Sequence, residues 1–530
     1  MPSGPQRQVF RFPRLGTGFR GELDVEGMTD EAFATGYLAE FRNYHLIGRG
    51  RARKRRGWQH LSTTKVSGSS AIQGLGTFNS GTTTKLVAAC YGTIKNYNGT
   101  DWTDITGTLT IGAGDQINFA QFGQEGTFYL IGTAGGNYDL WKWDGTASPA
   151  VSLYQATDAK PAPRWAKDIA EWRGRLWAIN TPLDDSAIQF SDNYVIDSWD
   201  EGNYIYPSRF AAGIGLASHN NGVLLAFYED SVHRIEFDTN LNDYSSYVVD
   251  GNTGCSSSYS IVTAEGITYF AGERGLYRIR SANRPAEYIS WPIQDYWNSL
   301  NQARTPYIWG FDRQEPWTEV VWLVSTGTNT QHNAAIVYNT ELESWSIFES
   351  ETGSLKFNCG CDYRNTEGKH FTVLGGYDGL VSEAWGDDNH DTNSRDGGDA
   401  GAVITTNLGT GMLDFGYPGL KRLREIWLDM QVNSDRIFSA SIETVGGTVV
   451  GVSPTPAVSV GAAGNRFDVA VFDSATFGSD DTPEQARILK SIKARMFRFN
   501  ITESGSGSPH TINSMTFHWI PRDLRFKAIV

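Results

Sequence analysis

Short alternating stretches of hydrophobic and polar residues dominate the chain from about residue 66 to residue 400. Each stretch is four to seven residues long, rich in aromatic and β-branched side chains, and bounded by Gly, Asn or Asp. Aromatic and β-branched side chains suit a pleated, half-buried surface, whereas Gly, Asn and Asp let the backbone turn tightly. The pattern therefore predicts many short antiparallel β-strands joined by tight turns.

A weak motif recurs in this region, in which an aromatic-rich strand meets a Gly, Asn or Asp turn. Its instances are Lys95–Gly99, Leu140–Gly145, Gly174–Trp177, Ser231–Ile235, Gly275–Ile279, Ala335–Asn339 and Gly376–Leu380. Several of them begin close to 45 residues apart, and repeats of about 40–50 residues with four strands each are typical of propeller blades. We predict one β-propeller of about seven blades over residues 66–400, with six to eight compatible with the spacing. A pair of β-sandwiches is the alternative, because its short strands have similar spacing.

The segment before the propeller, residues 1–65, has a different pattern. It begins with an arm rich in Pro, Arg and Gly and continues with hydrophobic residues at helical spacing. Those residues are Phe33, Tyr37, Leu38 and Phe41. This spacing, with Thr29 as a capping residue, predicts one short helix over Thr29–Phe41.

The segment after the propeller, residues 401–530, predicts a second β-domain. Stretches such as Phe497–Ile501 and Met515–Trp519 alternate between hydrophobic and polar residues, which is typical of half-buried antiparallel strands. We predict a β-sandwich here, and we expect the N-terminal segment to join it as a platform on one side of the propeller. A helix over Ser290–Leu300 and an acidic loop or linker over Gly386–Gly401 interrupt the strand pattern.

Composition restricts the class of protein. The chain has 58 Gly and 13% aromatic residues, and this aromatic content argues against low-complexity disorder. The four cysteines, Cys90, Cys255, Cys359 and Cys361, are too few and too scattered for a disulfide framework. There is no apolar signal-peptide core, and no run approaches the roughly 18 apolar residues of a membrane helix. We expect a soluble protein made in the cytoplasm.

The charge is distributed unevenly along the chain. The net charge is −14, yet residues 1–65 carry 12 basic and 6 acidic residues, whereas the remainder carries 33 basic and 53 acidic residues. A general nucleic-acid-binding protein would present a broad basic face. Because the acidic body repels a phosphate backbone, we exclude that class, and only the N-terminal segment could attract phosphate.

The candidate chemical motifs are weak, and we predict no catalytic, cofactor or metal site. Gly16–Gly21 matches GxGxxG but follows no strand, and the common signatures of phosphate loops, hydrolase elbows and zinc proteases are absent. Cys359 and Cys361 form a lone CxC near His370, whereas structural zinc usually takes four ligands. The acidic loop lacks the glycine and the bidentate glutamate of a calcium loop. The chain is therefore predicted not to be an enzyme.

The basic run Arg49–Arg56 places six positive charges within eight residues. Such charges repel one another, so they need acidic partners or phosphate nearby. Since the rest of the chain is acidic, we favour contacts within the platform or with a neighbouring subunit over a grip on DNA. The predicted subunit-contact residues are Arg51, Arg53, Lys54, Arg55 and Arg56.

Short motifs near both ends resemble those of phage propeller proteins. On the N-terminal side they are Ala39–Asn43, a Gly-rich turn and Arg53–Gly57; on the C-terminal side they are Asp414–Arg422, Phe497–Ile501 and Ile512–Trp519. The chain resembles the nozzle (tail tubular protein B) and tail-hub group of short-tailed phages. In that group a basic pair precedes Pro-Gly, and here Arg56 stands in place of the Pro.

The resemblance implies a structural protein of the virion tail, made and assembled in the host cytoplasm. Its implied partners are further copies in a ring, usually six, the portal-adaptor protein above it, and tail-fibre or tail-tip proteins. DNA would leave the capsid through the ring without tight binding, which suits an acidic lining. The alternative from the residues alone is a receptor-binding or carbohydrate-active propeller, such as a tail adhesin, in which aromatics and a carboxylate pair share a groove.

Overall fold

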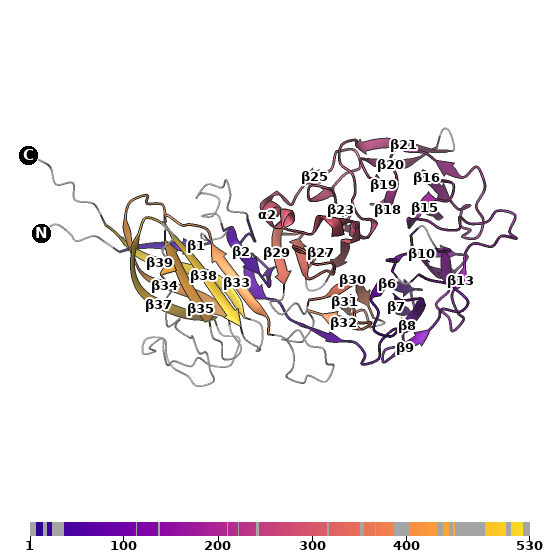
Figure 1. Ribbon diagram of the computed structural model, residues 1–530. Coiled ribbons are helices and arrows are strands. Elements are labelled where there is room, and N and C mark those ends of the chain that lie inside the picture. The colour runs from indigo at the N-terminus through magenta and orange to yellow at the C-terminus, as the bar shows by residue number, and fades with distance from the viewer. Residues whose placement is uncertain are drawn as a thin grey trace, which may run out of the picture.

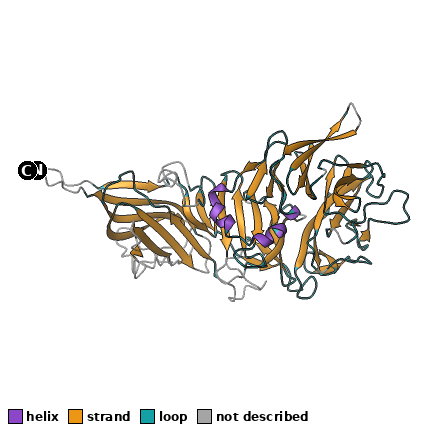
Figure 2. Cartoon of the chain, turned by 45° about the horizontal axis from the view of Figure 1, so that its top comes forward, coloured by secondary structure: helices purple, strands orange, loops and turns teal. Residues whose placement is uncertain are grey.

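The computed structural model describes residues 7–13, 19–23, 36–112, 114–135, 138–208, 210–220, 222–239, 243–314, 317–349, 355–365, 367–385, 403–431, 438–444, 449–450, 483–504 and 510–522. Strands make up most of the regular structure in these residues, and the helices among them are short (Figure 2). The strands form two bodies, a ring of small sheets and an elongated sandwich beside it (Figure 1).

Seven groups of four strands follow one another within the described part of the chain; six are separate sheets, and the sixth group in chain order is one end of a nine-stranded sheet. The first group is β6 (Ile72–Asn79), β7 (Thr84–Cys90), β8 (Thr93–Tyr97) and β9 (Trp102–Asp104), and the second is β10 (Asn118–Gln124), β11 (Thr127–Thr133), β12 (Trp141–Trp143) and β13 (Val151–Ser152). The third group is β14 (Asp168–Trp172), β15 (Arg175–Thr181), β16 (Asp184–Phe190) and β17 (Tyr204–Ile205). The fourth group is β18 (Gly213–His219), β19 (Val223–Tyr228), β20 (Val232–Asp238) and β21 (Asp243–Asp250). The fifth group is β22 (Val262–Ala264), β23 (Ile267–Ala271), β24 (Leu276–Ile279) and β25 (Glu287–Tyr288). The sixth group is β26 (Trp309–Arg313), β27 (Glu319–Val324), β28 (Ala334–Asn339) and β29 (Ser344–Glu349). The seventh group is β30 (Phe357–Arg364), β31 (His370–Gly376) and β32 (Val381–Ala384), together with β5 (Trp58–His60) from the N-terminal side.

The first strands of these groups close a ring. Strand β6 contacts β10, and contacts continue through β14, β18, β22 and β26 to β30, which contacts β6 again. Each group is thus one blade of a propeller, and hydrophobic clusters fill the spaces between neighbouring blades. The predicted all-β class and the propeller of about seven blades are confirmed.

The recurring motif of the sequence occurs once in each blade. Five of its seven instances lie on the third strand of a blade, namely β8, β12, β20, β24 and β28. The third strand carries large buried side chains, such as Trp141 and Trp143 on β12. Blades bury their apolar faces against each other, so one aromatic-rich strand per blade is what makes the repeat visible in the sequence.

The propeller is closed by a strand from the N-terminal side. Strand β5 pairs with β32 as the outer strand of the last blade, with Trp58 opposite Ala384 and His60 opposite Ser382. The Nδ1 atom of His60 lies 2.9 Å from the Ser382 hydroxyl, and the Trp58 ring meets the Phe357 ring edge-on. The propeller therefore begins before residue 66. The sequence pattern does not reveal this start, because a three-residue strand gives no periodic signal.

The second body is a sandwich of two sheets. One sheet has the order β3 (Tyr44–Ile47), β4 (Arg51–Lys54), β39 (Thr511–Pro521), β34 (Lys421–Gln431) and β37 (Pro483–Ala494), with β1 (Gln8–Phe12) also beside β39. The other has the order β2 (Leu38–Arg42), β33 (Thr405–Thr410), β38 (Phe497–Ser504), β35 (Phe438–Thr444) and β36 (Val449–Val450). Both ends of the chain contribute strands to it, and we call this sandwich the platform.

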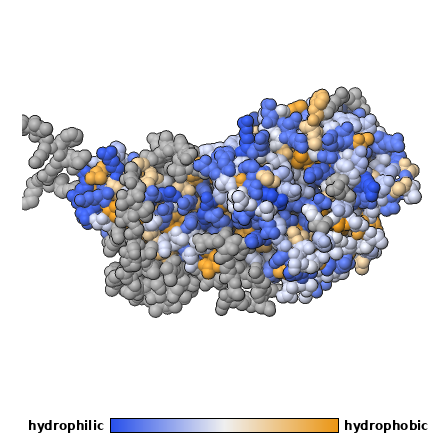
Figure 3. All heavy atoms as spheres, viewed as in Figure 1, coloured by the Kyte–Doolittle hydropathy of each residue, from blue (hydrophilic) through white to orange (hydrophobic). Residues whose placement is uncertain are grey.

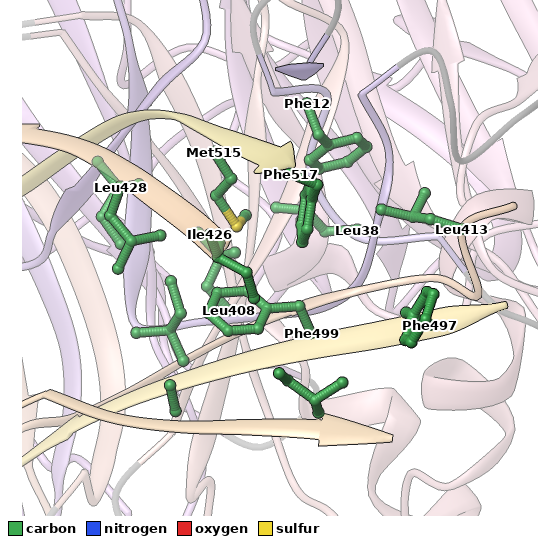
Figure 4. Close-up of a cluster of buried hydrophobic side chains, with 14 of the residues drawn as sticks. Phe12, Leu38, Leu408, Leu413, Ile426, Leu428, Phe497, Phe499, Met515 and Phe517 are labelled. Carbon is green, nitrogen blue, oxygen red and sulfur yellow. The ribbon is translucent and has the colours of Figure 1, made fainter. Parts of the chain in front are cut away.

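The platform core lies between the two sheets. Along β38 the side chains of Phe497, Phe499 and Ile501 point inward, while their neighbours are partly exposed. Figure 4 shows Phe12 and Leu38, from the N-terminal segment, within the same buried cluster as Phe499 and other C-terminal side chains. Neither segment could bury its apolar face without the other.

The helix predicted over Thr29–Phe41 is wrong in the part that the structure describes. Residues 24–35 lie outside the described residues, and Leu38–Arg42 forms strand β2, paired with β33. A bulge shifts the register between Leu38 and Glu40, so Leu38 and Phe41 both point into the core although they are three residues apart. This spacing imitates helical periodicity.

The other interruptions of the strand pattern have different outcomes. The helix predicted over Ser290–Leu300 is confirmed as η2 (Trp291–Ile293) followed by α2 (Gln294–Asn298), with Trp297 buried. The acidic loop Gly386–Gly401 lies outside the described residues.

His332 joins the sixth and seventh blades and makes the fold sensitive to acid. Its Nδ1 donates to the Phe357 carbonyl oxygen at 3.1 Å, and burial lowers its pKa to about 4. The folded chain therefore binds fewer protons than the unfolded chain between about pH 4 and pH 6.5, so stability is complete above this window and falls by up to about 3 kcal/mol through it.

We expect His332→Gln to remove this contribution while keeping a donor for the carbonyl. Urea unfolding at a series of pH values would show a shallower loss of stability below about pH 6.5 in the variant than in the wild type. Equal slopes would show that His332 is not the group that titrates.

Candidate functional site: the platform junction and the propeller axis

The basic run lies on β4 of the platform and on the residues directly before and after this strand. Along β4 the side chains of Arg51 and Arg53 face outward and those of Ala52 and Lys54 face inward. The Lys54 Nζ lies 2.6 Å from Glu503 Oε2, and both side chains are almost fully buried. Arg55 is also buried; its Nε donates to Asn43 Oδ1 at 2.8 Å. Lys54 and Arg55 thus make contacts inside the chain.

The other arginines of the run are more accessible. Arg51 is exposed, as is Arg49 before it, whereas Arg53 and Arg56 are half-buried. Arg53 and Arg56 line a pocket of about 240 Å³ at the boundary between platform and propeller, together with His45, Lys54, Arg313, Trp317 and Trp385. The predicted contact residues therefore divide between the interior, this pocket and the surface.

A buried carboxylate balances the charges next to this pocket. Glu319 Oε2 accepts from Arg313 Nη1 at 3.0 Å, and Oε1 accepts from Trp317 Nε1 at 2.7 Å. His45 Nδ1 lies 2.9 Å from the same Oε1. Burial alone would raise the pKa of Glu319, but His45, Arg313 and these hydrogen bonds hold the pKa below its ordinary value. The group fixes β3 to the sixth blade.

Asn43, at the corner between β2 and β3, connects three segments of the chain. Its Nδ2 donates to the carbonyl oxygens of Glu349 at 2.9 Å and Thr405 at 2.6 Å. Its Oδ1 accepts from Arg55 Nε and, at 3.0 Å, from the Glu349 backbone N–H. The backbone of Asn43 has φ of 59°, a conformation that Asn tolerates better than most residues.

The platform and the propeller also share a sheet. Strand β2 pairs in parallel with β29 of the sixth blade, with Arg42 opposite Ile347. The Ser346 hydroxyl donates to the Tyr44 carbonyl oxygen, and Asn339 Nδ2 donates to that of Leu46 at 3.3 Å. Opening this junction would leave buried polar groups unpaired, so these contacts hold the two bodies together.

The propeller axis holds a pocket of about 450 Å³, lined by residues from the first strand of every blade. Asp168 lies on this wall; its Oδ1 accepts from Asn118 Nδ2 at 2.9 Å and its Oδ2 from the Leu216 N–H at 2.8 Å. Burial raises the pKa of Asp168 to about 7. Since these partners sit on the neighbouring blades, Asp168 ties three inner strands together.

Further titratable side chains line the pocket at the axis. Asp312 and Asp362 line the pocket, and Asp362 is hydrogen-bonded to His370. Burial raises the pKa of Cys361, which also lines the pocket. A raised pKa makes a thiol a poorer nucleophile at neutral pH.

Of the weak motifs of the sequence, the structure describes the two CxC cysteines and the last glycine of the GxGxxG match. Cys359 and Cys361 are free thiols, and no cluster of three His, Cys, Asp or Glu side chains in the described part of the chain could hold a metal ion. Gly21 pairs with Trp345, and a Cβ at Gly21 would lie 2.4 Å from the Trp345 carbonyl oxygen. This glycine thus permits a close approach to the sixth blade, whereas Gly16 and Gly18 lie outside the described residues.

Sequence reasoning missed the acidic partner of the basic run. Glu503 continues the inward-facing series Phe497, Phe499 and Ile501 of β38, and Lys54 takes the inward phase of β4. A charged residue in an inward-facing position needs a buried partner. The inward-facing position of Glu503 in the alternating pattern of β38 was therefore the signal that the sequence offered for a buried ion pair. The pattern does not identify which lysine or arginine is the partner.

Comparison with known proteins adds little to this picture. No protein-family description matches the chain, and no curated protein does. Similar solved structures include virginiamycin B lyase from Staphylococcus aureus, at 10% identity and a TM-score of 0.38 over 59% of this chain and 94% of that one. Another is YCF48, at 12% identity and a TM-score of 0.37 over 62% of this chain and 96% of that one. Likeness at this level says nothing about what the chain binds.

No helix in the described residues is long and apolar enough to span a bilayer.

Proposed function

We propose that the chain is a structural, non-enzymatic subunit of a short phage tail, forming a ring as a nozzle or hub. The observation that carries the proposal is the platform junction. Both ends of the chain build the platform, and β2, β3 and Asn43 lock it to the sixth blade. A subunit that bears load in a ring needs a rigid connection of this kind between its bodies.

The charge distribution supports the same proposal. In a ring, DNA would pass between the subunits along the ring axis, since the pocket at the propeller axis measures only about 450 Å³. The net charge of −14 disfavours tight contact with the DNA backbone. Arg49, before β4, and Arg51, on β4, are exposed and are then available for acidic patches on the next subunit.

The proposal is tested by the assembly of the purified chain, alone and mixed with the portal-adaptor complex of the same phage. We expect rings for the wild type by electron microscopy and sedimentation. Arg49→Glu/Arg51→Glu should weaken association at least about tenfold, because the new charges repel an acidic neighbour. Arg284→Glu, at an exposed arginine on the fifth blade, is the matched control and should assemble normally.

Two outcomes would contradict parts of this proposal. A wild type that stays monomeric under all these conditions would refute the ring. Normal assembly by the double variant would refute the contact role of Arg49 and Arg51 only.

A receptor-binding or carbohydrate-active propeller is the second candidate. It is favoured by a groove of about 620 Å³ between the last and first blades, whose lining includes Tyr97, Tyr363, Phe371, Glu367 and Glu383. Aromatic rings and carboxylates in one groove suit a sugar ligand. Cleavage of a polysaccharide that disappears in Glu383→Gln would favour this candidate over the structural one.

A further inference from the structure

A second groove runs between the outer parts of the third and fourth blades. Its volume is about 670 Å³. The third blade contributes the turn between β14 and β15, the segment after β16, and β17, and the fourth blade contributes β20 and β21. We call it the outer groove; its principal lining residues are Arg173, Arg175, Tyr194, Tyr204, Phe237 and Tyr244.

The two arginines of the outer groove are held by aromatic rings and not by carboxylates. The Arg173 guanidinium lies 5.1 Å from the centre of the Phe237 ring, and that of Arg175 lies 5.3 Å from the Phe190 ring. Arg175 Nη1 also donates to the Ser191 carbonyl oxygen at 2.6 Å. Neither guanidinium forms an ion pair within the described residues, although the chain has a net charge of −14.

Two unpaired cations side by side are unusual in an acidic protein. Cation–π contacts restrict the orientation of a guanidinium but leave most of its five N–H donors free. A ligand carboxylate can accept two of these in a bidentate arrangement. Asp243 also lines the outer groove without pairing to either arginine, so it limits how densely charged a ligand can be.

Exposed aromatic rings stand next to these cations. Tyr194 is 60% exposed and Tyr204 is 41% exposed. Tyr194 is held against the β14–β15 turn, because its N–H donates to the Gly174 carbonyl oxygen at 2.6 Å and its ring covers Gly174. Rigid tyrosines of this kind offer a flat apolar face and a hydroxyl at little entropic cost. The apolar face of a sugar ring matches such a surface.

We propose that the outer groove binds an oligosaccharide that carries carboxylate groups. The carboxylate would lie at Arg173 and Arg175, and the sugar rings would stack on Tyr194 and Tyr204. An acidic peptide fits less well, because the edge strand β17 has only two residues and the edge strand β21 contributes only Asp243 and Tyr244 to the lining, so little backbone pairing is offered. The third and fourth blades lie away from the platform (Figure 1), so this binding does not depend on ring formation.

The test is a calorimetric titration of the purified full chain with oligogalacturonate and with a neutral maltooligosaccharide of equal length. We expect the carboxylated probe to bind more tightly and its affinity to fall with salt. Arg173→Ala/Arg175→Ala and, separately, Tyr194→Ala/Tyr204→Ala should each weaken binding at least about tenfold. Arg284→Ala, which removes an exposed charge elsewhere, should leave binding unchanged.

Several outcomes would overturn the proposal. These are absence of binding by oligogalacturonate, equal binding of the neutral probe, or unchanged affinity in both groove variants. A glutamate-rich peptide that binds more tightly than oligogalacturonate would assign the groove to an acidic protein segment instead. Because Arg175 is half-buried, its replacement in the double variant puts folding at risk. The single variant Arg173→Gln changes only an exposed residue, so weaker binding by this variant is not explained by a folding defect.

Discussion

Replacing Lys54 by Met should lower the free energy of unfolding by about 3–5 kcal/mol. Lys54 neutralises Glu503 inside the platform, and the exposed fraction of the Glu503 side chain is 0%. Without the ammonium group, the carboxylate must remain charged in an apolar core or take up a proton. Urea unfolding followed by tryptophan fluorescence measures the loss.

A double variant separates the charge from the packing. Lys54→Met/Glu503→Leu removes both charges and should recover most of the lost stability, because a well-packed apolar pair replaces a buried ion pair at little cost. His510 Nδ1 lies 3.9 Å from Glu503 and could compensate by protonation, so the comparison belongs near pH 8, where an ordinary histidine is neutral. A double variant as unstable as Lys54→Met would show that shape and not charge is decisive.

Replacing Asn43 by Ala should cost at least about 3 kcal/mol, because each buried polar group left unpaired costs about 1–3 kcal/mol. The side chain makes four hydrogen bonds, to Arg55, Thr405 and both backbone groups of Glu349. Since the two bonds to Glu349 join platform and propeller, calorimetry should show one transition in the wild type and two in the variant.

The control for Asn43 is a glycine. Asn43→Gly removes the same bonds but tolerates the φ of 59° without strain. If it is as unstable as Asn43→Ala, the hydrogen bonds account for the effect. A nearly wild-type Asn43→Gly would instead attribute the cost of Asn43→Ala to backbone strain.

The propeller was predictable because its blades repeat. Each blade places an aromatic-rich strand beside a turn, and a propeller repeats this unit at a nearly constant period. Strand β5 and strand β2 were not predictable in the same way. Three residues are too short for a periodic pattern in β5, and the bulge in β2 places Leu38 and Phe41 on one face as a helix would.

The contacts at the platform were only partly predictable. The excess of positive charge in Arg49–Arg56 predicts a need for acidic partners, and the structure shows one such partner, Glu503, for Lys54. The position of that partner, almost 450 residues further along the chain, follows from the contact of β4 in one sheet with β38 in the facing sheet and not from any local pattern. Asn43 gave no signal, because a single Asn between two hydrophobic stretches is typical of any turn.

Strand β5 has a consequence for the order in which the newly made chain can fold. Trp58 leaves the ribosome early but pairs with Ala384, and Arg53 pairs with Thr511. Contacts between residues so far apart in sequence form late. The propeller ring stays open until its last blade has been synthesised, and the platform stays incomplete until translation reaches β39. A prematurely terminated chain that lacks β39 therefore presents no finished platform.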